Sequence, residues 1–539
     1  MATTHQPIGG LPDSDSTVPD AHRCMSLTRR VLLVGCLSVF LAAVLSAYAY
    51  SARRVVSSDP FIYGNVAKAM LHGKRLYADV WEGKPPLGMM LYAVPQLFVQ
   101  GSYVAMLLFL GLWLAAEGLI FYIVLRRELP AALCCVIFVS LFPLTYWDFC
   151  WPSTEHFSNP FVAGLLLLAY VMVRDRTFTL AQCVLIGVLA VVAFHIRQNA
   201  AVAAVVPLAS VGFSPQPWRQ KALGIAAMAM AALLCWALVL LLVISIGDLH
   251  GYFYVVFTYP RVYAQAGGKT ELVALASYGA NTLLPLVALL FAGLALLGKH
   301  RWFVAGLMVV GIALCPIPWR GFPHYWVNLF PFVALCMGIG LQRQTIPAAN
   351  LRWTITAAIS LAVILSAAAA LYETYLLPSY IGFQKLAAIA DQVAPPGSTL
   401  FVCGPYHSAA VVFASSLPPA HSRYWFSYEI DHETPELLLE SRDAICDDYL
   451  KHPPGVIVIE QDWANDVLHP ASPTDTTSVR LIRTLATRYR YVIKGTVVDY
   501  LIMVRDPSLE AATLANTRPR PAPATEPATR PSTSAATGP

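Results

Sequence analysis

Charged residues are scarce in this chain of 539 residues. Asp, Glu, Lys and Arg make up 12% of it, against about a quarter in a soluble globular protein. Apolar residues make up 57%, the formal net charge is only +5, and the basic residues stand in short clusters between apolar runs. This pattern argues against nucleic-acid binding and predicts a membrane protein whose basic clusters record its topology.

Cysteine pairs at metal-site spacing are absent. None of the eleven cysteines belongs to a Cys-x-x-Cys pair, and most stand inside apolar runs, where cysteine behaves as a small buried apolar residue. The sequence therefore predicts neither a zinc site nor a disulfide framework. Apart from Cys24 near the N-terminus, only Cys403 and Cys446 lie in a clearly polar region, and a disulfide between these two remains open.

A nucleotide-binding loop is also missing. The tetrapeptide G-G-K-T at 267–270 resembles the end of a P-loop, but Tyr263 stands where that motif requires its first glycine. The sequence therefore does not predict ATP binding.

Long apolar runs occupy most of the chain up to residue 374. About twenty apolar residues are needed to cross about 30 Å of hydrocarbon, and this criterion predicts an all-α membrane domain of about eleven transmembrane helices over 29–374. Because the polar leader 1–28 is longer than that of a signal peptide, the first run is expected to be an uncleaved helix behind a disordered cytoplasmic N-terminus. The predicted spans are 31–50, 103–125, 131–149, 159–173, 179–196, 200–214, 222–246, 276–297, 302–316, 325–341 and 353–372.

The basic clusters orient the chain. Lys and Arg accumulate in cytoplasmic connections, and most clusters fall in alternate connections if 85–101, an apolar but short segment broken by Pro95, does not span. Arg53-Arg54, just after the first apolar run, count against this orientation but are outvoted by the other clusters. This orientation places a first outer loop, 51–102, on the non-cytoplasmic face. We therefore expect a multi-pass protein of the plasma (inner) membrane with its active face outside the cytoplasm.

The composition changes after residue 374. Short β-rich runs alternate there with helix-like segments, which predicts a small extracytoplasmic α/β domain over 375–510. The final segment, 511–539, is rich in Pro, Ala, Thr and Arg and is expected to be a disordered tail. The β-rich runs are 399–404, 455–460 and 491–504, and the helix-like segments lie near 381–393, 433–450 and 476–489.

Polar chemistry is concentrated in the segment 57–88, directly after the first apolar run. Asp59 opens an amphipathic pattern that is expected to lie along the membrane surface, and its carboxylate is a candidate general base. Lys84 precedes two prolines that fix the backbone, and a fixed ammonium at headgroup depth suits a phosphate. Taken alone, the carboxylate could be merely solvated and the lysine could be one that snorkels to the interface.

Further cationic candidates follow along the chain. Arg197, in H-I-R-Q-N between two apolar runs, is costly at a helix end unless it is paired or used. Arg320 and His324 form another cationic pair in sequence. His195 is expected to be a hydrogen-bonded residue at a helix end rather than a base or a metal ligand.

A second acidic group lies near Asp148 and Glu155. No spacing here matches a metal-site pattern. A divalent ion bridging Asp59 and Glu155 is kept as an alternative.

The order of several of these residues resembles a known family. Asp59, Tyr63, Ala67, Gly73, Tyr77 and Lys84-Pro85-Pro86 follow one another, as in the GT-C membrane glycosyltransferases. The relevant branch includes protein O-mannosyltransferases, lipid A aminoarabinose transferase and the lipopolysaccharide-core (Rgt-like) glycosyltransferases. Weaker echoes are P-S-T-E-H-F at 152–157, R-Q-N-A at 197–200 and R-G-F-P-H-Y-W-x-x-L-x-P at 320–331. The chain departs from the family at Asp59-Pro60, where many relatives have a paired acid, and at Glu82-Gly83-Lys84, where an acid often adjoins the lysine.

The resemblance implies a hexosyl- or pentosyltransferase that uses a polyprenyl-phosphate-linked sugar and inverts the anomeric centre. The acceptor would be a hydroxyl of a glycan, lipid or protein, and membrane lipids but no nucleic acid would be partners. No cofactor is required, because lipid phosphate is an adequate leaving group, although a divalent cation could assist. The implied site residues are Asp59 and Glu155 for catalysis, Lys84, Arg197 and Arg320 for the donor phosphate, and Tyr63, Tyr77, Glu82 and His324 for substrate binding.

Two other classes of function remain open at this stage. A lipid-linked-sugar flippase or transporter would also have many helices, although it would more often show repeat-related halves and charges within the spans. A membrane-anchored envelope-assembly protein without catalysis would not need polar loops that converge on one face.

Overall fold

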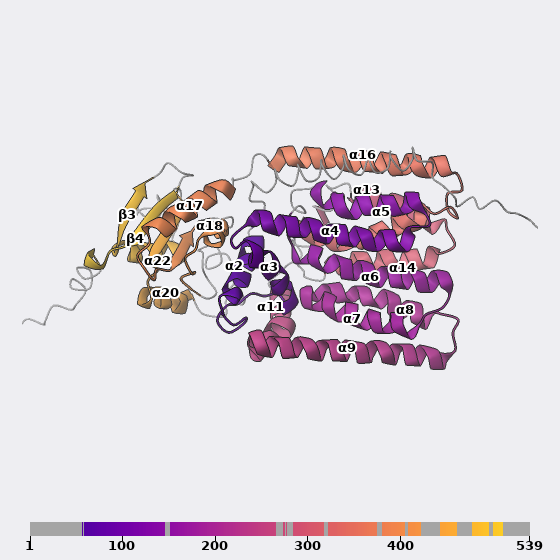
Figure 1. Cartoon of the computed structure of the whole chain (residues 1–539), viewed down its shortest axis with the longest axis horizontal. Helices are drawn as coiled ribbons and strands as arrows, with labels where there is room; N and C mark the ends of the chain where they lie inside the picture. Colours follow the sequence, from indigo (N-terminus) through magenta and orange to yellow (C-terminus); the bar gives the residue numbers. More distant parts are fainter. Residues whose placement is uncertain are drawn as a thin grey trace, which may run out of the picture. The chain divides into compact units, whose positions relative to one another are not determined.

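The computed structural model describes most of the chain from residue 57 onward (Figure 1). The predicted first span and the two predicted disordered ends lie outside the described residues, as do Asp148 and Arg320. All described residues belong to one compact unit, Ala49–Pro539. They are residues 57, 59–145, 151–265, 273–274, 276–277, 284–316, 322–374, 380–404, 408–421, 442–460, 477–494 and 500–509.

The helical region follows the predicted spans. Within the part of the chain that the structure describes, three helices are long and apolar enough to cross a membrane, namely α4 (Tyr103–Leu125), α6 (Thr154–Asp175) and α9 (Trp218–Ile246). Other helical segments occupy the remaining predicted positions that the structure describes. They are α5 (Leu129–Leu141), η1 (Phe142–Thr145), α7 (Leu180–Ile196), η2 (Gln198–Ala204), α8 (Val205–Gly212), α13 (Leu284–Leu296), α14 (Arg301–Leu314), η4 (Pro323–Leu329), α15 (Phe330–Gly340) and α16 (Ala349–Thr374).

Side-chain caps fix where the central helices begin. Ser102 accepts a hydrogen bond from the amide of Ala105 at the start of α4, and Ser153 accepts one from the amide of His156 at the start of α6. Such caps satisfy amide groups that have no partner within the helix. The helices α4, α6, α7 and α9 then pack as successive neighbours (Figure 1).

Two short helices precede this bundle. α2 (Asp59–Leu71) packs against α3 (Pro86–Phe98). α3 has 13 residues, about 20 Å of helix, which is shorter than the hydrocarbon thickness. The equally short α5 and α13 occupy predicted spans, so the prediction that 85–101 does not span stays a prediction. Between α9 and α13 the described chain forms α10 (Leu249–Phe253), the π-helical segment η3 (Tyr254–Thr258) and α11 (Tyr259–Gln265).

The predicted α/β fold of the C-terminal region is also present. A four-stranded sheet has the order β1-β2-β4-β3, in which β1 and β2 are parallel and the other two pairs are antiparallel. The strands are β1 (Leu400–Cys403), β2 (Val456–Glu460), β3 (Tyr489–Lys494) and β4 (Tyr500–Arg505), and the helices are α17 (Tyr380–Val393), α18 (Ala409–Ala414), α20 (Arg442–Lys451) and α22 (Thr477–Ala486).

The third predicted β-rich run holds two strands rather than one. β3 and β4 both fall largely within 491–504 and pair with each other in antiparallel register. Apolar residues continue through most of this run, so its composition does not reveal the reversal of direction. Gly495 and Asp499, residues typical of chain reversals, were the sequence signal for it.

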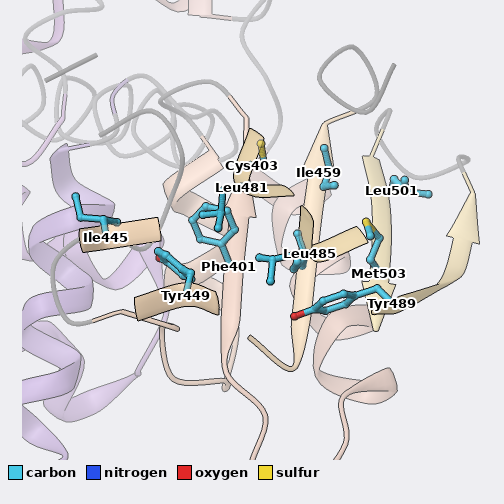
Figure 2. Packing of buried hydrophobic residues seen from close by; sticks show 11 residues of the cluster. Phe401, Cys403, Ile445, Tyr449, Ile459, Leu481, Leu485, Tyr489, Leu501 and Met503 are labelled. Carbon is cyan, nitrogen blue, oxygen red and sulfur yellow. The ribbon is translucent and has the colours of Figure 1, made fainter. Parts of the chain in front are cut away.

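One face of the sheet is buried against helices (Figure 2). Side chains at alternate positions of a strand point to the same face, and those of β1, β2 and β4 meet residues of α20 and α22 there. Cys403 belongs to this core and Cys446 packs against it, so both cysteines contribute to apolar packing. The strand residues are Phe401, Cys403, Ile457, Ile459, Leu501 and Met503, and the helix residues include Ile445, Tyr449, Leu481 and Leu485.

Candidate functional site

Asp59 is the first residue of α2 and is half-buried. A carboxylate is favourable at a helix N-terminus because unpaired amide groups give that end a partial positive charge. The hydroxyl of Tyr63, one turn later, donates a hydrogen bond to Asp59 Oδ2 at 3.0 Å. Burial, and then the charge of Asp59, raise the pKa of Tyr63 well above its usual value. Tyr63 therefore stays protonated and holds the carboxylate in place.

The loop that carries Lys84 is fastened to the end of α9. The amide of Leu76 donates to the carbonyl of Ile246, and the amide of Asp248 donates to the carbonyl of Leu76, both at 2.9 Å. Tyr77 adopts a left-handed conformation, with φ of 67°, and its hydroxyl donates to the carbonyl of Lys84 at 2.8 Å. A non-glycine residue in this conformation is uncommon and is found where the surroundings enforce it. Tyr77 thus sets the position of Lys84.

Lys84 lies in a mixed electrostatic environment. Burial lowers the pKa of its ammonium, and the positive charge of Arg197 lowers it further. The carboxylates of Glu82, Asp59 and Glu155 act in the opposite direction. The Lys84 ammonium also lies 5.6 Å from the centre of the Tyr63 ring, within the range of a cation–π contact. Lys84 is therefore a cation that an approaching anion would stabilise.

Arg197 follows the last residue of α7 and is 5% exposed. Its guanidinium forms an ion pair of 2.7 Å with Glu155 and donates a hydrogen bond to Thr154 Oγ1 at 3.0 Å. It also lies 4.9 Å from the centre of the Tyr325 ring. His324 Nε2 lies 3.7 Å from the same oxygen of Glu155, Oε1. A buried charge requires such partners, and Glu155 supplies the main one.

A cavity of about 100 Å³ joins these elements. It is bordered by the Lys84 loop, the start of η2, α11 and η4. Two cations and three phenol rings on its wall suit an anionic group attached to a less polar body. The lining residues are Gly83, Lys84, Arg197, Gln198, Asn199, Tyr259, Pro260, Tyr263 and Tyr325.

The structure brings together every candidate site residue that it describes. Asp59, Glu155, Arg197 and Lys84 all influence the charge state of His324, which places them in one cluster. Their roles in a reaction stay predictions. Glu155 nevertheless differs from the other carboxylates, because it is already engaged as the counterion of Arg197.

Two residues predicted to bind substrate make contacts that shape the Lys84 loop instead. Tyr77 is 4% exposed and donates to the carbonyl of Lys84. The half-buried Glu82 accepts a hydrogen bond from the amide of Gly83 at 2.9 Å. Substrate binding by these two residues stays a prediction, and the contacts observed are those that hold the loop.

Sequence reasoning missed several residues of the site. Thr154 pairs with Arg197, and Tyr325 packs under the same guanidinium. Tyr259 and Tyr263 line the cavity. The available signal was position, because Thr154 and Tyr325 directly adjoin the predicted residues Glu155 and His324.

His195 has the structural role expected of it. It is fully buried, its Nδ1 is 2.8 Å from the carbonyl oxygen of Val191, and its Nε2 is 2.9 Å from the hydroxyl of Tyr252. Both ring nitrogens are therefore engaged away from the cavity. Within the described ranges, no group of three or more His, Cys, Asp or Glu residues could hold a metal ion.

Comparison of the sequence with family models and with curated proteins found no match. Comparison with solved structures found similar proteins. ArnT from Cupriavidus metallidurans in the apo state is similar with a TM-score of 0.56 and 15% identity, covering 89% of this chain and 99% of that one. ArnT from the same organism bound to undecaprenyl phosphate has a TM-score of 0.57 and 14% identity, covering 88% and 99%. The chain therefore has the ArnT-like GT-C fold that the sequence predicted.

Proposed function

We propose that this chain is an integral-membrane glycosyltransferase that moves a sugar from a polyprenyl-phosphate-linked donor to an acceptor hydroxyl. The observation that carries the proposal is the convergence of Lys84 and Arg197 on one cavity, within electrostatic reach of Asp59. The fold adds support, since the similar ArnT structure holds undecaprenyl phosphate. A lipid phosphate of that kind would be the product released here.

The proposed step is a single displacement. The acceptor oxygen forms a bond to the anomeric carbon while the bond from that carbon to the phosphate oxygen breaks, and the electron pair leaves with the lipid phosphate. The carboxylate of Asp59 takes the proton of the acceptor hydroxyl. Lys84 and Arg197 stabilise the negative charge on the departing phosphate. Attack opposite the leaving group inverts the anomeric centre.

The proposal places the reaction on the non-cytoplasmic face. Its support is that the site gathers at the start of α6 and the ends of α7 and α9, whereas Arg174 and Arg219 mark the other ends of α6 and α9. Clusters of basic residues favour the cytoplasmic side. On the outer face a lipid carrier is the available source of an activated sugar.

The proposed chemistry assigns no step to a metal ion or an organic cofactor. The two cations of the site would carry out the charge stabilisation that a divalent ion supplies in other transferases. We expect transfer to continue in the presence of a chelator, and loss of transfer that added Mg²⁺ or Mn²⁺ restores would contradict this part of the proposal.

The test uses the purified full-length protein in lipid nanodiscs with a polyprenyl phosphate carrying a radiolabelled sugar, and envelope glycans or glycolipids as acceptor. Wild type should release polyprenyl phosphate and label the acceptor. Asp59→Asn should lower transfer by about 10²–10⁴-fold while donor still binds. The matched control is Asp79→Asn, because Asp79 is paired with Arg75 at the exposed surface of the loop.

Each rival function has its own result in this assay. Normal transfer by Asp59→Asn would contradict the proposed base. Movement of donor across liposome membranes without release of lipid phosphate would identify a flippase. Mass spectrometry of envelope glycans from cells with and without the protein would then identify the sugar and the acceptor.

A further inference from the structure

The helix that carries Asp59 has two functional faces. Asp59 and Tyr63 lie one turn apart on the face directed to the site. Phe61, Gly64 and Lys68 are spaced three and four residues apart and so share another face of the same helix. This second face contacts α18 of the α/β region.

The apolar part of this second face is tightly packed. The Phe61 ring stacks on Tyr380 at 5.6 Å and lies 5.6 Å from the Phe413 ring. A Cβ added to Gly64 would lie 2.5 Å from the Phe413 ring, which real Cβ atoms do not tolerate. The hydroxyl of Tyr380 donates to the carbonyl of Gly101 at 2.6 Å. These contacts leave α2 little freedom to move relative to α17 and α18.

Lys68 adds a polar contact at the end of this face. Its ammonium donates a hydrogen bond to the carbonyl oxygen of Ser415, directly after α18. The Ser415 hydroxyl in turn donates to Asp391 of α17, and the amide of Ser416 donates to the same carboxylate at 2.8 Å. Burial lowers the pKa of Lys68 and the charge of Asp391 raises it in part. We call Lys68, Ser415 and Asp391 the α2 latch.

We propose that the α2 latch makes the α/β region a positioning element for catalysis, with Lys68 acting on the reaction through the placement of Asp59. The Lys68 ammonium is directed onto the Ser415 carbonyl, and Asp391 of α17 holds Ser415 in place. A lysine that merely faced solvent would not make such a contact. The contact joins residues 347 positions apart in the chain, so it links the helical region to the α/β region. Displacing a reacting group by about 1 Å can lower the rate by about a hundredfold. The link to Asp59 rests on the function proposed above.

The experiment compares Lys68→Met, which keeps the length of the side chain but removes its charge, with Lys68→Arg, which keeps the charge. In the nanodisc assay Lys68→Met should lower kcat about tenfold with little change in the KM for donor, and Lys68→Arg should restore most of the loss. Asp391→Asn should also lower kcat, although it changes no residue of α2. Lys385→Met is the matched control, because Lys385 lies exposed on α17.

A second readout does not depend on activity. Amide hydrogen exchange of α2, measured by mass spectrometry, should speed up in Lys68→Met and Asp391→Asn but not in Lys385→Met. If exchange and kcat both stay at wild-type values in Lys68→Met, the latch is overturned. If exchange rises but kcat is unchanged, or if only the KM for donor changes, its role in catalysis is overturned. Inactive wild-type protein would instead contradict the proposed function while leaving the exchange result interpretable.

Discussion

The two cations of the cavity differ in how firmly they are already bound. Arg197 is paired with Glu155 and stacked on Tyr325, so part of its charge is committed before any ligand arrives. The ammonium of Lys84 has a ring contact and several carboxylates at a distance. We therefore assign Arg197 mainly to building the site and Lys84 mainly to binding the phosphate.

Replacing Lys84 by alanine should weaken donor binding. A charge-assisted contact of this kind contributes about 1.5–3 kcal/mol, so the KM for the donor should rise by about tenfold to a hundredfold with a smaller effect on kcat. Initial rates at varied donor concentration measure this. Lys74→Ala, in the exposed part of the same loop, is the control. An unchanged dependence of rate on donor concentration would contradict the phosphate role.

The lowered pKa of Lys84 predicts an alkaline limit to donor capture. The ammonium form binds phosphate, and since burial lowers its pKa, the charge is lost at a pH below the usual lysine range near 10.4. The value of kcat/KM, which reports the free enzyme, should fall as pH rises through this lowered pKa. In Lys84→Arg the fall should move to higher pH. An identical alkaline limit in both proteins would show that another group sets it.

The same pKa shift affects stability with the opposite sign. Because the folded state holds the Lys84 proton less tightly than the unfolded state, the unfolded state binds more protons between the two pKa values. The contribution of this residue to folding therefore improves as pH rises through that window. Donor capture and stability thus respond to alkaline pH in opposite directions.

At the residue scale, sequence reasoning identified residues whose type is unusual for their place. Asp59, Lys84 and Arg197 are charged groups beside apolar runs, and the family resemblance gave them an order. Thr154 and Tyr325 carry no such signal, since a threonine and a tyrosine near a membrane surface are common. Their contacts with Arg197 depend on which helix ends meet, which spacing alone does not specify.

At the scale of elements, the end of α9 holds the Lys84 loop through a backbone contact that requires glycine. A Cβ on Gly247 would lie 2.6 Å from the carbonyl oxygen of Leu76. Backbone cannot move aside as the end of a side chain can, so the loop itself must shift.

Gly247→Ala should therefore impair the site from outside the cavity. We expect kcat/KM to fall about tenfold as Lys84 is displaced, with the protein still monodisperse on size exclusion. Gly306→Ala on α14 is the matched control, because a Cβ there meets nothing within 4 Å. Full activity of Gly247→Ala would show that the loop tolerates the shift.

The helices and strands were more predictable from the sequence than the contacts between them. The expected span 103–125 coincides with α4, and the interrupted segment at 85–101 contains the short helix α3. Length and hydropathy decide such cases locally. The pairing of β3 with β4 depends on where the chain reverses its direction. The contact of α2 with α18 depends on how distant segments of the chain fold together. Composition records neither.

At the scale of the whole molecule, the described part of the chain buries few charged side chains, and most of these have partners. Glu117 in α4 departs from this rule. It is 1% exposed, and its Oε1 has no hydrogen-bond partner within the described part of the chain. Glu128, by contrast, forms an ion pair of 3.0 Å with Arg352 and so joins the start of α5 to α16.

Replacing each of these two glutamates by leucine should change thermal stability in opposite directions. Glu117→Leu removes a buried carboxyl whose Oε1 has no hydrogen-bond partner among the described residues, which is worth about 1–3 kcal/mol, and should raise the thermal midpoint of the detergent-solubilised protein. Glu128→Leu leaves the mostly buried Arg352 without its carboxylate, and should lower the midpoint. Scanning fluorimetry of both variants beside wild type measures the difference. A fall for Glu117→Leu equal to that for Glu128→Leu would mean that the Glu117 carboxyl makes a stabilising contact, and that the membrane domain depends on a polar group in the middle of α4.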